Sequence, residues 1–423
     1  MSCRHCSAKL SLELIDLGSS PPSNAYLTSD MLSAPEKTYP LRIMVCERCW
    51  LVQTLDFAQA DELFSSEYAY FSSFSTTWLQ HAERYVAEMI ERFRLTEGSH
   101  VVEIASNDGY LLQYVKARGI PCTGIEPTAS TARAAREKGI DTIETFFGAE
   151  VGARLATEGK QADLMAGNNV LAHVPDINDF LKGFANLLKP EGVVTFEFPH
   201  LLPLLAENQF DTIYHEHFSY LSLTAVEKIF KANGLAIIDV AEIPTHGGSL
   251  RVFAQRSATG RHPISDRVAN ILARESEAGL STAKGYQGFQ SRAEKVKDDF
   301  VSFLIDAKRQ GKRVAAYGAA AKGNTLLNFA GIRRDLIAYV VDRNPAKQDK
   351  FMPGSRIPIV SEDVLYRDAP DFVVILPWNL KSEVMHQLRD AGLSAVRFVT
   401  AVPELEIVES GDVTRLAPKR TVQ

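Results

Sequence analysis

A short segment in the middle of the chain, residues 214–220, concentrates side chains that can exchange protons. Its sequence, YHEHFSY, contains two imidazoles, a carboxylate and two phenols. Imidazole has the ordinary pKa best suited to proton transfer near neutral pH, and we predict that His217 is a general base. An extended segment would place His215 and His217 on one face and Tyr214 and Glu216 on the other, whereas a turn would let all four converge. The alternative is a structural segment packed in a core or an interface.

Four of the five cysteines form two Cys-x-x-Cys pairs, Cys3 with Cys6 and Cys46 with Cys49. Two such pairs supply four thiolates, which can close a tetrahedral shell around Zn²⁺ and leave no open position. We therefore predict a structural zinc site, with redox pairs or buried thiols as the alternatives. His5 lies inside the first pair, where a surface role is favoured over a role as a substitute ligand.

A nucleoside-binding pattern follows at residues 100–112, HVVEIASNDGYLL. It predicts a buried strand, a tight turn of small residues and a helix that begins near Tyr110. Small residues let a ligand approach the backbone, and the start of a helix offers unpaired amides. About two dozen residues further on, the strand-like run CTGIE ends in Glu126, where a carboxylate can bind ribose hydroxyls. An ordinary αβ crossover is the alternative, since it also needs a tight turn.

A second turn of this kind, YGAAAKGN, follows the apolar run RVAA and precedes a helical pattern. Its backbone amides are suitably placed to meet phosphate. Lys322 comes before Gly323 rather than after it, so the segment is not a Walker loop. Asp342 ends the next apolar run, which imitates part of an NAD fingerprint. A purely structural turn is the alternative.

The composition is that of a folded globular protein that acts on a metabolite. The chain has 423 residues, of which 45% are hydrophobic and 23% charged, and its net charge is -6. This charge offers no positive field for nucleic acid. The N-terminus lacks a basic stretch followed by an apolar core, and no apolar run reaches about 18 residues. We therefore expect a cytoplasmic protein, with neither nucleic acid nor a membrane as partner.

The elements that must position these groups fall into several domains, because a chain of this length exceeds one ordinary core. Apolar strand-like runs alternate with helical patterns in two regions, which predicts two α/β domains with largely parallel sheets. The last two runs of the first region, LAIIDVAEI and SLRVFAQ, are candidates for an antiparallel hairpin. The predicted divisions are a zinc-binding domain (1–70), a catalytic domain (71–256), a helical connector (257–311), a Rossmann-like domain (312–410) and a polar tail (411–423).

The turn after the first strand resembles the first motif of class I methyltransferases, acid-x-Gly-x-Gly-x-Gly. Glu103, Ala105, Asn107 and Gly109 stand in that frame, and only Gly109 keeps a glycine. Taken together with the cysteine pairs and the YHEHFSY segment, this variant resembles the sugar C-methyltransferases of antibiotic and polysaccharide deoxysugar pathways. The resemblance covers almost the whole chain. It implies a multidomain α/β protein: a small zinc-binding domain, a class I methyltransferase sheet and a C-terminal Rossmann-like domain.

The resemblance also implies two cofactors, S-adenosylmethionine and structural Zn²⁺, and roles for individual residues. The residues expected around the methyl donor are Glu103, Ser106, Asn107, Gly109, Glu126, Pro127 and Asn168. The catalytic residues are expected to be His217, Tyr214 and Glu216, with Tyr214 relaying a proton or holding an enolate oxygen. The expected substrate-binding residues are Tyr68, Tyr70, Asn169, His173, His215, Lys322, Gly323 and Asn324. Lys322 would face a diphosphate, and His173 would share a helical face with Asn169 if the stretch is helical.

The predicted reaction is the methylation of carbon in a nucleotide-linked 4-keto-6-deoxysugar, with C-3′ as the predicted position. Carbon becomes nucleophilic when a base removes the proton beside a ketone and the enolate oxygen is stabilised. A dTDP-sugar or another nucleoside-diphosphate sugar would be the substrate of a monomer or small homo-oligomer. Two alternatives come from other classes: an NAD-dependent nucleotide-sugar oxidoreductase and a non-enzymatic zinc adaptor.

Overall fold

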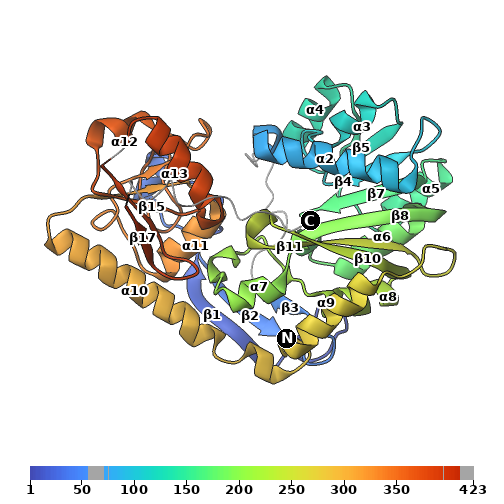
Figure 1. The fold of residues 1–423 in the computed structure, drawn as a ribbon, viewed down its shortest axis with the longest axis horizontal. Helices are drawn as coiled ribbons and strands as arrows, with labels where there is room; N and C mark the ends of the chain where they lie inside the picture. The colour runs from blue at the N-terminus through green and yellow to red at the C-terminus, as the bar shows by residue number, and fades with distance from the viewer. Residues whose placement is uncertain (56–70, 75, 394, 410–423) are drawn as a thin grey trace. The chain divides into compact units, whose positions relative to one another are not determined.

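The computed structural model describes residues 1–55, 71–74, 76–393 and 395–409 (Figure 1). The chain divides into two compact units, and each unit is assembled from three separate segments. The first unit consists of Met1–Leu12, Met44–Leu202 and His217–Gly285. The second consists of Glu13–Ile43, Pro203–Glu216 and Tyr286–Gln423. The domain boundaries given above stay predictions, and the candidates Tyr68 and Tyr70 and the polar tail lie outside the described residues.

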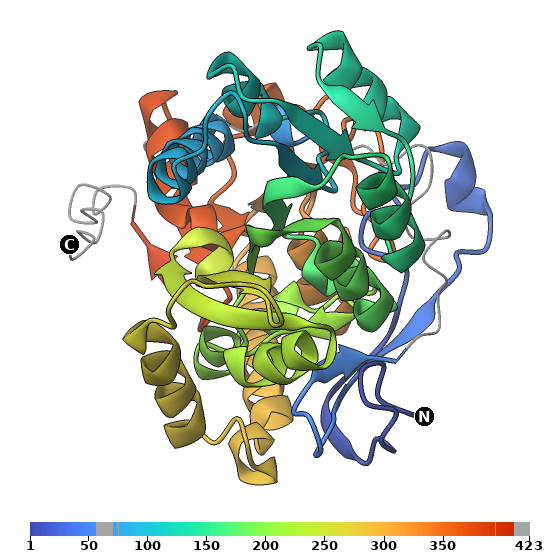
Figure 2. The ribbon, with the colours of Figure 1, turned by 90° about the vertical axis from the view of Figure 1, so that its right-hand side faces the viewer.

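A seven-stranded sheet forms the centre of the first unit, in the order β10-β11-β8-β7-β4-β5-β6. The five strands from β8 to β6 are parallel, as the alternation of apolar runs and helical patterns predicts. The last two strands form the expected antiparallel hairpin, which is the long yellow-green ribbon of Figure 2. The strands are β4 (Val101–Ile104), β5 (Cys122–Ile125), β6 (Asp141–Ile143), β7 (Ala162–Asn168), β8 (Leu188–Pro199), β10 (Leu235–Ile243) and β11 (Ser249–Arg256).

The helices of this unit bury apolar faces, and some of them begin at side-chain caps. The Asp176 carboxylate accepts hydrogen bonds from the amides of Asn178 and Asp179 and so caps α6, whereas the Ser222 hydroxyl caps α8. The helices are α2 (Thr76–Phe93), α3 (Leu112–Ala117), α4 (Ala129–Glu137), α5 (Ala149–Thr157), α6 (Ile177–Leu187), α8 (Leu223–Ala232) and α9 (Asp266–Glu277). Short 3-10 turns are η2 (Ser72–Phe74), η3 (Leu171–His173), η5 (Thr245–Gly247) and η6 (Ala283–Tyr286).

A short strand pair joins the cysteine region to the histidine region within the first unit. β3 (Val52–Thr54) pairs antiparallel with β9 (Ser219–Tyr220), so that Gln53 lies opposite Ser219. The residues that follow Cys49 therefore lie beside the residues that follow His217.

The second unit contains a six-stranded sheet in the order β14-β13-β12-β15-β16-β17, parallel except for its last pair. Its strands are β12 (Val314–Tyr317), β13 (Val340–Val341), β14 (Ile359–Val360), β15 (Phe372–Ile375), β16 (Arg397–Thr400) and β17 (Glu406–Val408), and β1 (Leu12–Ser20) neighbours β2 (Tyr39–Val45). Its helices and turns are η1 (Asp30–Ser33), η4 (Phe210–Thr212), α10 (Phe289–Arg309), α11 (Ala321–Phe329), α12 (Asp363–Asp368), η7 (Trp378–Leu380) and α13 (Lys381–Asp390). A further helix, α7 (Leu201–Ala206), crosses from the segment of the first unit to that of the second.

Candidate functional site

The four paired cysteines converge, and their sulfur atoms all lie within 4.8 Å of one another. The Sγ atoms of Cys3 and Cys49 are 3.5 Å apart, as are those of Cys6 and Cys46, and all four side chains are free thiols. Zn–S bonds of about 2.3 Å in a tetrahedron require sulfur atoms about 3.8 Å apart. The donor set and its spacing therefore fit one Zn²⁺ with four thiolate ligands.

Two equivalent backbone turns present these thiols. The amide of Ser7 donates to the carbonyl of Cys3, and the amide of Trp50 donates to the carbonyl of Cys46, at 2.9 and 2.7 Å. Ser7 and Trp50 both have positive φ, 58° and 67°, which closes each turn tightly. His5 is no part of the cluster, because its Nδ1 lies 2.8 Å from the side-chain oxygen of Asn178.

Glu126, at the carboxyl end of β5, holds the turn that follows β4. One carboxylate oxygen accepts a hydrogen bond from the amide of Asn107 and the other from the amide of Thr128, both at 2.9 Å. Ala105 and Asn107 have positive φ, so the turn is wound tightly without glycine at either position. Pro127 follows directly in the chain.

A set of buried polar atoms lies at the carboxyl ends of β4 and β7. Among the described residues, no hydrogen bond of ordinary geometry reaches the Glu103 carboxylate, the Ser106 hydroxyl or the Asn168 carbonyl oxygen. Burial raises the pKa of Glu103 well above its usual range, and Glu126 and Asp108 raise it further, while the nearby Tyr110 hydroxyl opposes them. Buried polar atoms of this kind require a partner, and the polar groups of S-adenosylmethionine fit that requirement.

The backbone conformation of the turn and the packing around it both explain why a glycine stands at position 109. Its φ is +75°, and a Cβ atom there would lie 2.3 Å from the side chain of Ile140. The following helix begins at Leu112, two residues later than the sequence predicts, because Tyr110 and Leu111 still belong to the turn. Contact between Gly109 and the donor stays a prediction.

His217 and His173 form a pair in the first unit. Their rings meet edge to face, with centroids 4.6 Å apart, and the ring of Tyr220 lies 5.9 Å from that of His217. The amide of Phe218 donates to the carbonyl of Ala172, which ties the two histidine segments together at 2.8 Å. His217 is buried, with 8% of its surface exposed. The expected sharing of a helical face by Asn169 and His173 is wrong, because η3 begins only at Leu171 after Asn169 has turned with a positive φ of 51°.

The residues just before His217 belong to the second unit. His215 and Glu216 form a turn, which decides between the two conformations left open by the sequence. The His215 Nε2 atom lies 3.2 Å from the Tyr39 carbonyl, and burial lowers the pKa of this imidazole. Asn24 donates to Glu216 at 3.1 Å, and burial raises the pKa of the Glu216 carboxyl. His215 and His217 therefore have different partners, and the roles of Tyr214, His215 and Glu216 stay predictions.

Lys322, in the first turn of α11, lies in a half-buried polar cluster of the second unit. Its ammonium donates to the Asn379 side chain at 2.8 Å and lies 4.7 Å from the ring centroid of Trp378. The Trp378 indole donates to Asp211 at 2.8 Å. Burial raises the pKa of Asp211 to about 6, whereas Lys322 lowers it. These contacts hold the Lys322 side chain in place, and its role toward a diphosphate stays a prediction.

The other two candidates in this loop have structural contacts. A Cβ atom on Gly323 would lie 2.8 Å from the side chain of Leu376, so close packing requires glycine there. The side-chain NH₂ of Asn324 donates to the Ser23 carbonyl at 2.6 Å. The side-chain oxygen of Asn324 has no hydrogen-bond partner among the described residues. Asp342 accepts amides from Ala319 and Asn344, both at 2.8 Å.

Comparison with known proteins places this arrangement in a family. Three family models match successive parts of the chain: a zinc binding domain over residues 3–64, a methyltransferase domain over residues 78–240 and a C-methyltransferase C-terminal domain over residues 244–403. The C-methyltransferase NovU of Streptomyces niveus is 36% identical over 408 residues, which cover 96% of this chain and 97% of the relative. The chain belongs to the C-methyltransferase family.

This C-methyltransferase uses S-adenosylmethionine and has a class I methyltransferase fold with an N-terminal zinc-binding domain, as the sequence predicts. A ubiquinone biosynthesis O-methyltransferase of Chelativorans sp. (strain BNC1) is 27% identical over 99 residues, 23% of this chain and 39% of the relative. The magnesium protoporphyrin IX methyltransferase structure from Synechocystis PCC 6803 covers 42% of this chain and 79% of its own, with 18% identity and a TM-score of 0.33. The family membership replaces the two alternatives, an oxidoreductase and a zinc adaptor.

Several structural residues of the C-methyltransferase had no signal in the sequence. Glu197, buried in β8, lies 2.8 Å from the imidazole of His81 and accepts a hydrogen bond from Arg251 at 2.7 Å. Burial opposes ionisation of Glu197, but these two partners outweigh it and lower its pKa. Glu197 is 54 positions from Arg251 and 116 positions from His81 in the chain. The sequence alone therefore does not show that these residues are in contact.

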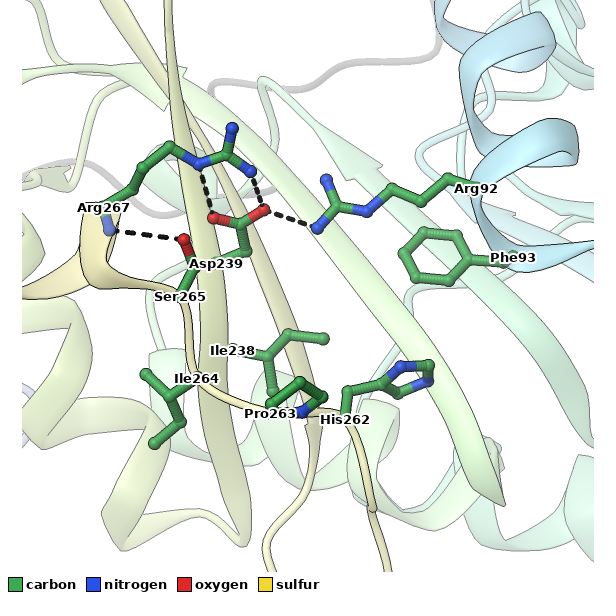
Figure 3. A pocket seen from close by; sticks show the side chains of 9 residues that line it. All are labelled: Arg92, Phe93, Ile238, Asp239, His262, Pro263, Ile264, Ser265 and Arg267. Atoms are coloured by element: carbon green, nitrogen blue, oxygen red, sulfur yellow. Dashed lines mark hydrogen bonds and ion pairs between the residues drawn. The ribbon is translucent and has the colours of Figure 1, made fainter.

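A separate pocket of about 300 Å³ lies beside β10 and contains none of the predicted site residues. Figure 3 shows Asp239 between the two guanidinium groups of Arg92 and Arg267, with His262 and Phe93 on the wall. The Arg267 Nε atom donates to Asp239 at 2.8 Å. Asp239 compensates much of the positive charge, so the C-methyltransferase offers no strong anion site here. Among the described residues, no helix combines the length and the hydropathy needed to span a membrane.

Proposed function

We propose that this C-methyltransferase transfers a methyl group to carbon, at C-3′, in a nucleotide-linked 4-keto-6-deoxysugar. The observation that carries the proposal is the contact between His173 and the buried His217, in the same unit as the buried polar atoms expected to meet the donor. Methylation of carbon needs a base, because the carbon becomes a nucleophile only after it loses a proton. Oxygen and nitrogen already carry a lone pair, so their methylation depends less on such a base. The relative NovU, named a C-methyltransferase, supports transfer to carbon.

The base in this proposal is His217. An imidazole nitrogen takes the proton from the carbon beside the ketone, and the electron pair left on that carbon forms the enolate. His173 contacts the ring of His217 edge to face and limits its rotation, which keeps the base over one proton. The low exposure of His217 limits the access of bulk water, which keeps water from competing for the enolate.

The enolate oxygen needs a hydrogen-bond donor, and the proposal assigns this to Tyr214, three residues before the base. Glu216, buried and with a raised pKa, binds a hydroxyl or an amine of the sugar. Lys322 faces the diphosphate of the nucleotide, and Asn169, His215, Gly323 and Asn324 complete the substrate contacts. S-adenosylmethionine, when bound, supplies an electrophilic methyl group, and Glu103, Ser106, Asn107, Gly109, Glu126, Pro127 and Asn168 would hold it.

Exchange of hydrogen for deuterium tests the base before any methyl transfer. Each of a panel of nucleoside-diphosphate 4-keto-6-deoxysugars is incubated in D₂O with the enzyme and no methyl donor, and proton NMR follows the ring hydrogens. The substrate should lose the hydrogen at C-3 only, and addition of labelled S-adenosylmethionine should then place the methyl at that carbon. Exchange at C-5, or methylation without any exchange-competent ketone, would contradict the proposal.

A further inference from the structure

Arg4, between the first two zinc-ligand cysteines, binds three segments of the first unit at once. Its Nη1 donates to the carbonyl of Pro175 at 2.8 Å, and its Nη2 donates to the carbonyl of Thr54 at 3.0 Å. The guanidinium also lies over the ring of Phe218, 5.2 Å from the centroid. A planar guanidinium suits this task, because its donors point in fixed and different directions.

Two of the three segments that Arg4 contacts carry the histidine pair. Pro175 lies two residues after His173, and Phe218 lies directly after His217. Thr54 completes the link, because its hydroxyl donates to the His217 carbonyl at 2.5 Å and its amide donates to the Phe218 carbonyl at 3.1 Å. Arg4 therefore sets the separation of the two histidine segments from one side.

Arg4 itself is fixed by the metal centre. It follows the ligand Cys3, and its amide donates to the side-chain oxygen of Gln53 at 2.9 Å. The other end of the same Gln53 amide donates to the Cys3 sulfur at 3.3 Å. Gln53 is buried and lies opposite Ser219 in the β3–β9 pair, two residues beyond His217.

We propose that Arg4 is a positioning residue for the His173–His217 pair. Through Arg4, the backbone turn that carries Cys3 and Cys6, here called the zinc turn, sets the geometry of the base. This role rests on the function proposed for His217. A structural zinc site ordinarily stabilises its own domain. Here the contacts extend from the first ligand turn to both histidine segments in a continuous series, Cys3–Gln53–Arg4–Thr54–His217 and Arg4–Pro175. A base displaced by about 1 Å can lose about a hundredfold in rate.

The test compares Arg4→Gln with Arg48→Gln, an exposed arginine inside the second cysteine pair. Both proteins are assayed for bound zinc, for S-adenosylmethionine affinity, for turnover and for ring deuteration in D₂O. The signals of His173 and His217 are followed by NMR with ¹⁵N-labelled histidine. We expect Arg4→Gln to keep its zinc and its donor affinity, to lose roughly tenfold to a hundredfold in turnover and deuteration, and to shift both histidine signals. Arg48→Gln should match the wild type in all of these.

Two further variants keep the proposal open to refutation. Arg4→Lys retains the positive charge but replaces the two separated donors of the guanidinium with one ammonium group. Its turnover should therefore be nearly as low as that of Arg4→Gln. If Arg4→Gln loses zinc, Thr54→Val decides, because it removes the hydroxyl bond to the His217 carbonyl and leaves the zinc turn untouched. Unchanged histidine signals and turnover in Arg4→Gln, or in Thr54→Val in that case, overturn the inference. Shifted signals in Arg4→Gln, together with full activity of His217→Asn, would sustain the positioning role and remove His217 as the base.

Discussion

The imidazole rings of His173 and His217 lie edge to face, with their centroids 4.6 Å apart, although the two residues are 44 positions apart in the chain. If His217 is the base, replacing it with Asn should lower turnover by about 10² to 10⁴ and leave the affinity for both substrates nearly unchanged. Steady-state kinetics and D₂O exchange measure the two effects. His262→Asn, a change to a histidine of the separate pocket, is the matched control. Wild-type exchange in His217→Asn with an inactive Tyr214→Phe would make the phenol the base.

The Glu126 carboxylate holds the turn that follows β4, and it is predicted to bind the ribose of the donor. Glu126→Ala removes the acceptor for the amides of Asn107 and Thr128, together with any bonds to the nucleoside. The loss should weaken S-adenosylmethionine binding by about 1.5–3 kcal/mol, as for hydrogen bonds to a charged group. Calorimetric titration measures it, and Glu137→Ala, on the surface of α4, is the control. Equal affinities in the two variants would remove Glu126 from the donor site.

Donor affinity should depend on pH through Glu103. Burial raises the pKa of this carboxyl, so it binds a proton over a wider pH range in the free protein. A cationic group of the donor favours the ionised form, and binding therefore releases a proton below the raised pKa. Affinity should rise with pH by up to about tenfold per pH unit and level off above that pKa. Titrations in buffers of different ionisation enthalpy count the protons, and a Glu103→Gln protein that kept the same pH dependence would assign it elsewhere.

Purified protein should carry about one zinc per chain, measured by elemental analysis of material prepared without added metal. Cys49→Ala removes one of four thiolates and should reduce both the zinc content and the thermal stability. Cys122→Ala, a half-buried cysteine of β5, should reduce neither the zinc content nor the response to a chelator. Metal-free protein with Cys3 and Cys6 joined in a disulfide would replace the zinc site with a redox pair.

Glu275 should be one of the most sensitive positions for stability. It is fully buried in α9, lies 2.7 Å from the His200 imidazole and accepts the amides of Leu223 and Thr224 at the start of α8. Glu275→Gln should cost roughly 1–3 kcal/mol in the free energy of unfolding, because the side-chain NH₂ of Gln cannot accept the hydrogen bonds that one of the buried carboxylate oxygens accepts. Denaturant titration measures this cost, and the exposed Glu277→Gln in the same helix is the control.

The same carboxylate gives a stability change in acid. Burial opposes its ionisation, but the bonds from His200 and Thr224 outweigh burial and lower its pKa. Its contribution is therefore complete above the unfolded value of about 4.3 and is lost as the pH falls through the lowered folded value. The difference in unfolding free energy between wild type and Glu275→Gln should shrink in that acid range. A difference that grew in acid would contradict the assignment.

The sequence was sufficient where local pattern decides structure. The apolar runs of β4, β5, β7 and β8, the β10–β11 hairpin, the cysteine pairs and the helical character of residues 257–311 follow from periodicity and spacing. It was insufficient for β1 and β2, in a region rich in turn residues, and for β14, which has only two residues, because pairing with a neighbouring strand, and no apolar pattern of their own, defines them. Ring contact between His173 and His217 likewise depends on Thr54 and Ala172, which carry no motif.

The interleaved course of the chain constrains how the protein is made. The first unit is complete only when residues up to Gly285 are available, since its sheet needs β10 and β11 beside β8. Chains emerge from the ribosome at about 5–20 residues per second, and contiguous domains fold as they appear. Here the edge of β8 that pairs with β11 has no hydrogen-bonding partner until β11 has been synthesised. Rapid synthesis in a heterologous host should therefore yield inclusion bodies, and slower translation at low temperature should raise the yield of folded enzyme.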